Sequence, residues 1–211
     1  RLIGEAATLA GPVQLDAQMY GGAPVSAGGA VLAYRGGEVN TTQLTWLDRE
    51  GRELGLVGPP GEYQDPALSP DGTRILVNAA GGRQLALLTL GGGAFVPLTF
   101  KSEFLTTHSW SPDGRSIAYG SNRNGRFEIF LAPAGGGGVE ERLVHGETTN
   151  WGPSFSPDGQ LLLYENSDPK TQYDLWVVPL VGDRKPRPFL RTEASEVHAG
   201  FSPNGRWVAY T

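Results

Sequence analysis

The feature that most constrains the fold of this chain is a short motif that recurs at nearly constant spacing. Four segments, residues 65–72, 107–114, 152–159 and 198–205, align without gaps and end in Ser-Pro-Asp-Gly or Ser-Pro-Asn-Gly. Residues 22–29 form a degenerate fifth copy. The aligned serines are separated by 43, 42, 45 and 46 residues. Such a period is typical of one four-stranded blade of a β-propeller, so the repeats predict five blades.

Each repeat has the same internal order. An apolar residue precedes the serine, and the Asp-Gly or Asn-Gly pair tolerates the positive φ that a tight hairpin needs. A β-rich run follows, then a polar turn, a third strand and a shorter fourth strand. Pro97 and Pro188 lie in fourth strands, where an unpaired outer edge tolerates proline. The pattern predicts four antiparallel strands in each blade.

Composition supports an all-β chain and excludes several classes. The 31 glycines and 16 prolines supply many turns, and a hydrophobic content of 39% is too high for a disordered chain. A net charge of −5 without a basic stripe argues against nucleic acid as a partner. No apolar run is long enough to insert into a membrane, and the start at Arg1 does not read as a signal peptide. The absence of cysteine excludes disulfides and thiolate metal sites.

The repeats divide a single domain, residues 1–211, into blades at about 17–62, 63–103, 104–149 and 150–194. Residues 4–11 resemble residues 51–58, which end a repeat, so we expect residues 195–211 and 1–16 to form the closing blade together. Closure in this way removes exposed sheet edges. The third strand of that blade is missing from the sequence, which predicts a short blade or one completed by strand exchange with a second copy. We also expect the chain to be a fragment of a longer protein.

The motif around Trp110–Leu131, with Ser-Pro-Asp-Gly, Ile-Ala-Tyr and Ser-Asn-Arg-Asn-Gly, resembles the TolB-like WD-type β-propeller repeat. The resemblance extends over residues 22–211. Residues 167–171, 173–180 and 183–186 also resemble the C-terminal, sensor-like propellers of bacterial membrane-bound serine/threonine kinases, although no kinase signature is present. The family resemblance implies an extracytoplasmic or periplasmic location and the binding of a protein or ligand, without naming one.

A candidate metal site lies just before the repeated serines. In a propeller the innermost strands line a central channel, and this position places Asp65, His108 and His198 at the funnel of three different blades. Two imidazoles and a carboxylate suit a divalent metal such as zinc, manganese or calcium, and an open site of this kind activates water for ester or phosphoester hydrolysis. The alternative is that these polar residues are only solvated or hydrogen-bonded in turns.

A candidate ligand-binding surface lies at the same funnel. Trp151 and Asn150 come directly before the third clear copy, and Tyr63 holds a similar place before the first. An aromatic ring here can contact a peptide, a sugar or another ligand, with local packing as the alternative. By contrast, Asp71, Asp113 and Asp158 recur at one place in every repeat, which indicates turn chemistry rather than catalysis.

Three functional hypotheses follow. The first is a binding or sensor-like module that uses the funnel around the axis for a peptide, protein or small ligand and performs no covalent chemistry. The second is a metal-dependent hydrolase that uses Asp65, His108 and His198. The third is a scaffold attached to a further domain. The sequence favours the first, because no catalytic motif such as Gly-x-Ser-x-Gly accompanies the repeats.

Overall fold

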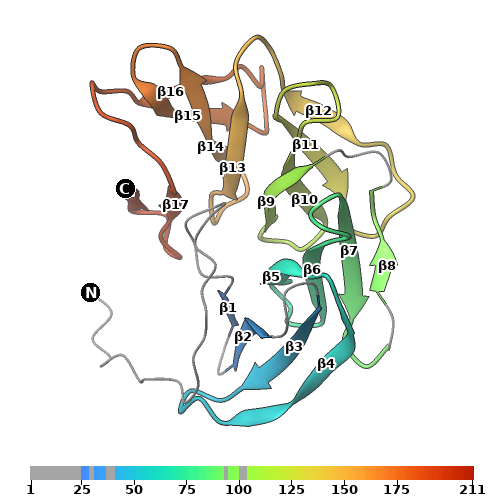
Figure 1. Cartoon of the computed structure of the whole chain (residues 1–211). Coiled ribbons are helices and arrows are strands. Elements are labelled where there is room, and N and C mark those ends of the chain that lie inside the picture. The colour runs from blue at the N-terminus through green and yellow to red at the C-terminus, as the bar shows by residue number, and fades with distance from the viewer. Residues whose placement is uncertain (1–24, 29–30, 37–40, 93–94, 100–103) are drawn as a thin grey trace.

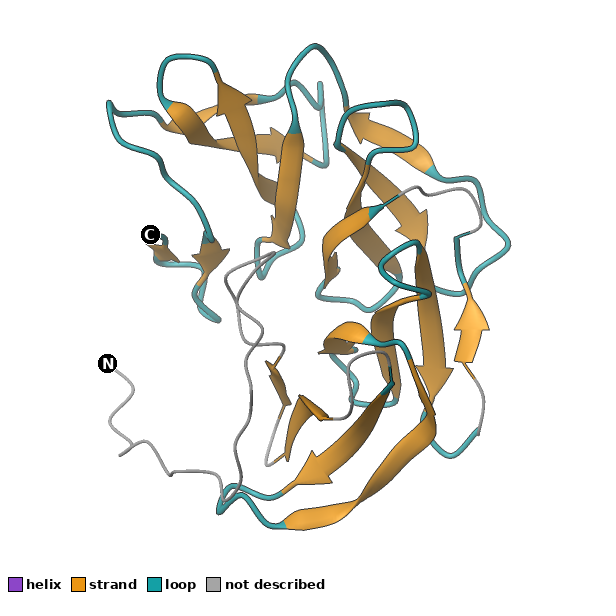
Figure 2. Ribbon diagram, viewed as in Figure 1, coloured by secondary structure: helices purple, strands orange, loops and turns teal. Residues whose placement is uncertain are grey.

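The computed structural model describes residues 25–28, 31–36, 41–92, 95–99 and 104–211. Every regular element in these residues is a β-strand (Figure 2). Four sheets of four antiparallel strands follow one another along the chain, and a two-stranded hairpin comes last. Blade 1 contains β1 (Val25–Gly28), β2 (Val31–Gly36), β3 (Thr42–Leu47) and β4 (Glu53–Gly61). Blade 2 contains β5 (Gln64–Leu68), β6 (Arg74–Ala79), β7 (Gln84–Thr89) and β8 (Phe95–Pro97).

The second half of the chain repeats this arrangement. Blade 3 contains β9 (Leu105–Trp110), β10 (Ser116–Ser121), β11 (Glu128–Pro133) and β12 (Glu141–Val144). Blade 4 contains β13 (Asn150–Phe155), β14 (Leu161–Asp168), β15 (Gln172–Pro179) and β16 (Arg187–Leu190). The terminal hairpin consists of β17 (Gly200–Phe201) and β18 (Val208–Ala209).

The sheets fan out around a common centre (Figure 1). Each innermost strand contacts the next one: β1 contacts β5, β5 contacts β9, β9 contacts β13, and β13 contacts β17. This arrangement confirms the all-β propeller of four-stranded antiparallel blades. Residues 1–16, which were predicted to complete the closing blade, lie outside the described residues.

The core lies between neighbouring blades rather than within them. Successive side chains of a strand point to opposite faces, so each middle strand serves two interfaces. In β6, Ile75 and Val77 pack against blade 1, whereas Leu76 packs against blade 3. In β10, Tyr119 packs against blade 2 and Ala118 against blade 4. This double use explains why the second strand of each repeat reads as a continuous apolar run.

The repeated Ser-Pro-Asp-Gly segments form hydrogen-bonded turns. Ser69 Oγ donates to Asp71 Oδ1 at 2.6 Å and accepts the backbone N–H of Arg74 at 2.9 Å, while Gly72 has φ +68°. The hydrogen bond from Ser69 is the main reason why the pKa of Asp71 falls to about 2. Equivalent serine bonds recur at the other three copies: Ser111, Ser156 and Ser202. The prediction of turn chemistry for the repeated aspartates is confirmed.

These turns also stack on one another between blades. A Cβ added to Gly114 would lie 3.7 Å from the Pro70 ring of the preceding blade, and Gly159 and Gly205 stand in the same relation to Pro112 and Pro157. The motif proline of one copy therefore contacts the motif glycine of the next copy, which links successive repeats around the ring.

Candidate functional site

The innermost strands begin with an irregularity at the mouth of the funnel. The register shifts between Gln64 and Ala67 in β5 and between Trp151 and Ser154 in β13. The repeat position four residues before the serine is left-handed in three copies, with φ +50° at Asp65, +64° at Gly152 and +56° at His198. A non-glycine residue adopts this conformation only when its surroundings impose it, and a bulge re-aims the side chains beside it.

The structure brings two of the three predicted metal ligands near one another. Asp65 in β5 and His108 in β9 are close enough to interact electrostatically, and Asp65 Oδ2 accepts a hydrogen bond from Asn78 Nδ2 at 2.9 Å. Burial lowers the pKa of His108 to about 4, and the Asp65 charge opposes this only in part. The imidazole is therefore neutral at neutral pH.

His198 lies in a different environment. Its backbone N–H donates to Glu165 Oε1 at 2.6 Å, and its exposed ring places Nδ1 3.2 Å from Thr211 Oγ1. Within the described part of the chain, no three His, Asp or Glu side chains gather in a way that could hold a metal ion. The structure thus does not assemble the predicted set of Asp65, His108 and His198. Asp65 and His198 share the left-handed backbone of this repeat position and differ in their partners, since Asp65 Oδ2 accepts from Asn78 whereas Nδ1 of His198 lies beside Thr211 Oγ1.

Trp151 is the centre of an aromatic cluster at the start of blade 4. Its ring centroid lies 5.0 Å from that of Tyr173 and 6.0 Å from that of Phe127, which comes from blade 3. All three rings are half-buried. The indole Nε1–H donates to Glu165 Oε2 at 2.7 Å, which fixes the orientation of the ring. A fixed, half-exposed tryptophan flanked by two aromatic rings is well suited to anchor a ligand. We call Phe127, Trp151 and Tyr173 the aromatic cluster.

Glu165 connects this cluster to the terminal hairpin. Its buried carboxylate accepts one bond from Trp151 and one from the backbone of His198. Desolvation raises the pKa of Glu165, and the two donated hydrogen bonds oppose the shift. A Cβ at Gly152 would lie 2.9 Å from Glu165 Oε1, so glycine is needed there both for its positive φ and for this close approach.

The other two predicted ligand-binding residues are packed into the blades. Asn150 is buried, donates to the Thr148 carbonyl at 3.1 Å and accepts from Asn166 Nδ2 at 2.7 Å. Tyr63 lies in the core between blades 1 and 2, with its ring centroid 4.4 Å from that of Phe95. The structure therefore does not place Asn150 and Tyr63 in the aromatic cluster with Trp151, and their roles in ligand binding stay predictions.

Sequence reasoning missed Asn78, Glu165 and the two aromatic neighbours of Trp151. The repeat alignment contains a signal for Asn78 and Glu165. Asn78 and Glu165 occupy the same repeat position, nine residues after Ser69 and Ser156, directly after the apolar run of the second strand. A buried polar residue in such a strand needs a partner, so its presence predicts a contact at the funnel.

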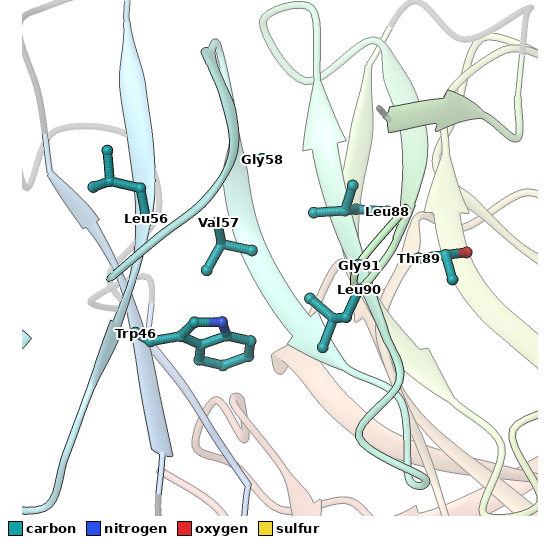
Figure 3. Close-up of a pocket in the computed structure, with 8 residues that line it drawn as sticks. All are labelled: Trp46, Leu56, Val57, Gly58, Leu88, Thr89, Leu90 and Gly91. Atoms are coloured by element: carbon teal, nitrogen blue, oxygen red, sulfur yellow. The ribbon is translucent and has the colours of Figure 1, made fainter. Parts of the chain in front are cut away.

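A separate groove lies on the outer side of the ring, between blades 1 and 2 (Figure 3). Trp46 and Val57 line one wall, and Leu88 and Leu90 line the other. The exposed Leu56 lies at its rim. The groove is formed by β3, β4, β7 and the turn after β7, and the predicted axial residues do not contribute to it.

Four-stranded blades arranged around an axis, with polar and aromatic groups at the funnel, define the chain as a β-propeller. Residues 22–211 match the TolB beta propeller domain family, and the chain belongs to this family. The described residues include no helix long and apolar enough to cross a membrane.

One protein of known sequence and two solved structures are similar to this chain. The uncharacterised protein Atu1656 of Agrobacterium fabrum is 36% identical over 120 residues, which cover 56% of this chain and 40% of the relative. A TolB candidate from Agrobacterium tumefaciens superposes with a TM-score of 0.73 at 28% identity, covering 86% of this chain and 65% of its own. TolB from Acinetobacter baumannii superposes with a TM-score of 0.66 at 22% identity, covering 85% of this chain and 45% of its own. This similarity shows that the two chains share a fold. The chain spans less than two thirds of the length of each relative.

Proposed function

We propose that this propeller is a binding module that receives a peptide or protein partner on the aromatic cluster at the mouth of its axis. TolB-like propellers are protein-interaction modules in general. The observation that carries the specific site is the fixed orientation of Trp151, which is held by Glu165 and flanked by Phe127 and Tyr173. Large aromatic side chains in a preorganised setting commonly supply most of the energy of a protein interface.

The surroundings of the cluster supply polar contacts as well. Asp168 and Arg191, which form an ion pair at 2.5 Å, lie at the turn before Tyr173 and after β16. Asp168 is the last residue of β14, and Lys170 follows it in an exposed turn. An aromatic centre with a charged, solvated rim has the composition of a typical protein interface.

The experiment selects peptides from a displayed library against the wild-type chain and measures their affinity by fluorescence anisotropy. We expect Trp151→Ala to weaken the selected peptides at least about tenfold, as is usual for a central aromatic anchor. Trp207→Ala is the matched control, because this tryptophan is 69% exposed and is not one of the three rings of the cluster. Equal affinities for the wild type and Trp151→Ala, with unchanged circular dichroism spectra, would contradict the proposal.

TolB-family proteins are periplasmic, and we propose the same location for this chain by family resemblance. The resemblance to kinase propellers, the completion of the closing blade by strand exchange and the metal-dependent hydrolase all stay predictions.

A further inference from the structure

Glu165 is a buried carboxylate that joins the aromatic cluster to the terminal hairpin. It is 6% exposed, and it accepts the Trp151 indole N–H at 2.7 Å through Oε2 and the His198 backbone N–H at 2.6 Å through Oε1. A buried carboxylate without hydrogen-bond donors carries a large desolvation cost. The same group therefore needs two donors, of which one lies in β13 and the other lies two residues before β17.

A second hydrogen bond joins the same two regions. The backbone N–H of Glu196 donates to the carbonyl of Tyr173, a member of the aromatic cluster, at 2.8 Å. The carbonyl of Phe127 accepts in the same way from the backbone N–H of Asn150 at 2.8 Å, which attaches blade 4 to blade 3. Two of the three cluster residues thus hold the start of the following repeat through their carbonyl groups. The terminal repeat is bonded to the surroundings of the cluster through Tyr173 as well as through Glu165.

The repeat position of Glu165 is one that links neighbouring blades. Its equivalent in blade 2, Asn78, donates through Nδ2 to the Thr106 carbonyl of blade 3 at 3.3 Å. Its equivalent in blade 3 is Gly120, which has no side chain. Among these positions in blades 2 to 4, Glu165 is the one that connects a side chain of the aromatic cluster with the repeat that follows. A change in the orientation of Trp151 therefore has a direct path to the terminal hairpin.

We propose that Glu165 is a latch through which the orientation of Trp151 and the docking of the terminal hairpin on blade 4 stabilise each other. Loss of either donor leaves a buried carboxylate with a single hydrogen bond, which favours movement of the carboxylate toward water and release of the remaining donor. Because coupling between two sites is reciprocal, a partner that holds Trp151 in its present orientation also stabilises the docked hairpin. This last consequence rests on the proposed function, whereas the latch itself does not.

The test is amide hydrogen exchange of the whole chain, followed by NMR without any ligand. Trp151→Phe keeps an aromatic ring but removes the indole donor. We expect the amides of Glu196 and His198 to exchange at least about threefold faster in this variant, while the amides of β10 in blade 3 keep their rates. Trp176→Phe is the matched control, because it removes an indole of the same blade whose Nε1 has no hydrogen-bond partner among the described residues. This control should leave the exchange of Glu196 and His198 unchanged.

A double-mutant cycle with Glu165→Gln distinguishes the latch from a general loss of stability. The glutamine amide offers one acceptor oxygen in place of two, so this variant should also speed up exchange at His198, and adding Trp151→Phe should accelerate it no further. If circular dichroism shows that Glu165→Gln does not fold, the comparison of Trp151→Phe with Trp176→Phe decides alone. Three results would overturn the proposal. These are unchanged exchange at His198 in Trp151→Phe, effects of the two substitutions that multiply in the double variant, and an equal acceleration of the amides in β10.

Discussion

Blade 4 and the terminal hairpin carry the same repeat motif but differ in what covers them (Figure 1). Tyr164 in blade 4 is 1% exposed, whereas its counterpart Tyr210 is 52% exposed. Leu163 is fully buried, whereas its counterpart Ala209 is exposed. In blade 4, β14 pairs with both β13 and β15; in the terminal hairpin, β18 pairs only with β17 among the described strands.

The turn at the motif is nevertheless the same in both. Ser156 Oγ donates to Asp158 Oδ1 at 2.5 Å, and Ser202 Oγ donates to Asn204 Oδ1 at 2.8 Å. The comparison teaches that the motif determines its own turn from local hydrogen bonds. Burial of the strand that follows depends on neighbouring sheets, which the motif does not supply.

The largest effect should come from truncating the two equivalent tyrosines. Tyr164→Ala removes a buried ring from the core between blades 3 and 4 and should lower the free energy of unfolding by roughly 3–5 kcal/mol. Tyr210→Ala should cost less than about 1 kcal/mol, because half of that ring is already in water. Urea denaturation measures both, and similar costs at the two positions would show that the hairpin is covered in solution.

A smaller effect is expected at the bulge of β13. Gly152→Ala combines a strained positive φ with a Cβ 2.9 Å from Glu165 Oε1, and should lower the free energy of unfolding by roughly 2–3 kcal/mol. Gly182→Ala is the matched control: its φ is +83°, but no atom lies within 4 Å of the added Cβ. Thermal denaturation should show a cost of only about 1 kcal/mol for the control. Equal losses would mean that backbone strain, and not contact with Glu165, requires glycine at position 152.

The motif serine should contribute more to the free energy of unfolding inside a blade than in the terminal hairpin. Ser156→Ala removes the bond to Asp158 and leaves the backbone N–H of Leu161 without the Ser156 oxygen, at a cost of about 1–2 kcal/mol. Ser202→Ala removes the equivalent bonds from an exposed hairpin, which can open locally, and should cost below about 0.5 kcal/mol. Amide hydrogen exchange in the two hairpins distinguishes a loss of global stability from local opening of one hairpin. A larger cost at Ser202 than at Ser156 would contradict this expectation.

The smallest effect is a difference in pH dependence between the two turns. The hydrogen bond from Ser156 lowers the pKa of Asp158 in the folded state, whereas Asn204 does not titrate. A lowered folded-state pKa gives stability that is present above the unfolded value, near 4, and is lost as the pH falls through the folded value. We expect Asp158→Asn to be less stable than the wild type at pH 6, with the difference shrinking below about pH 4. Because the pKa of Asp71 is about 2, its contribution to stability should persist until the pH falls to about that value. Urea midpoints from pH 6 to pH 2 measure the effect, and a difference that does not change with pH would contradict it.

Much of the fold was predictable because the repeat is encoded locally. The spacing of the serines predicted the order of the strands, and the Asp-Gly pairs predicted the turns that the structure contains. The candidate site was less predictable. The role of Trp151 in ligand binding stays a prediction, and its partner Glu165, which lies in the next strand 14 residues away, was not foreseen. The role of Asp65 and His108 as metal ligands stays a prediction, and the hydrogen bond from Asn78 to Asp65 was not recognised.

The sequence by itself determined the repeat, its four strands, the hydrogen-bonded turns and the alternation of side chains that lets one strand serve two interfaces. These properties depend on backbone preferences and contacts within a few residues. Only the tertiary structure decided which polar groups meet at the funnel, because the partners come from other strands, as Glu165 does for Trp151 and Asn78 does for Asp65. It also decided that Tyr164 is buried and Tyr210 is not, since burial depends on neighbouring sheets rather than on the motif.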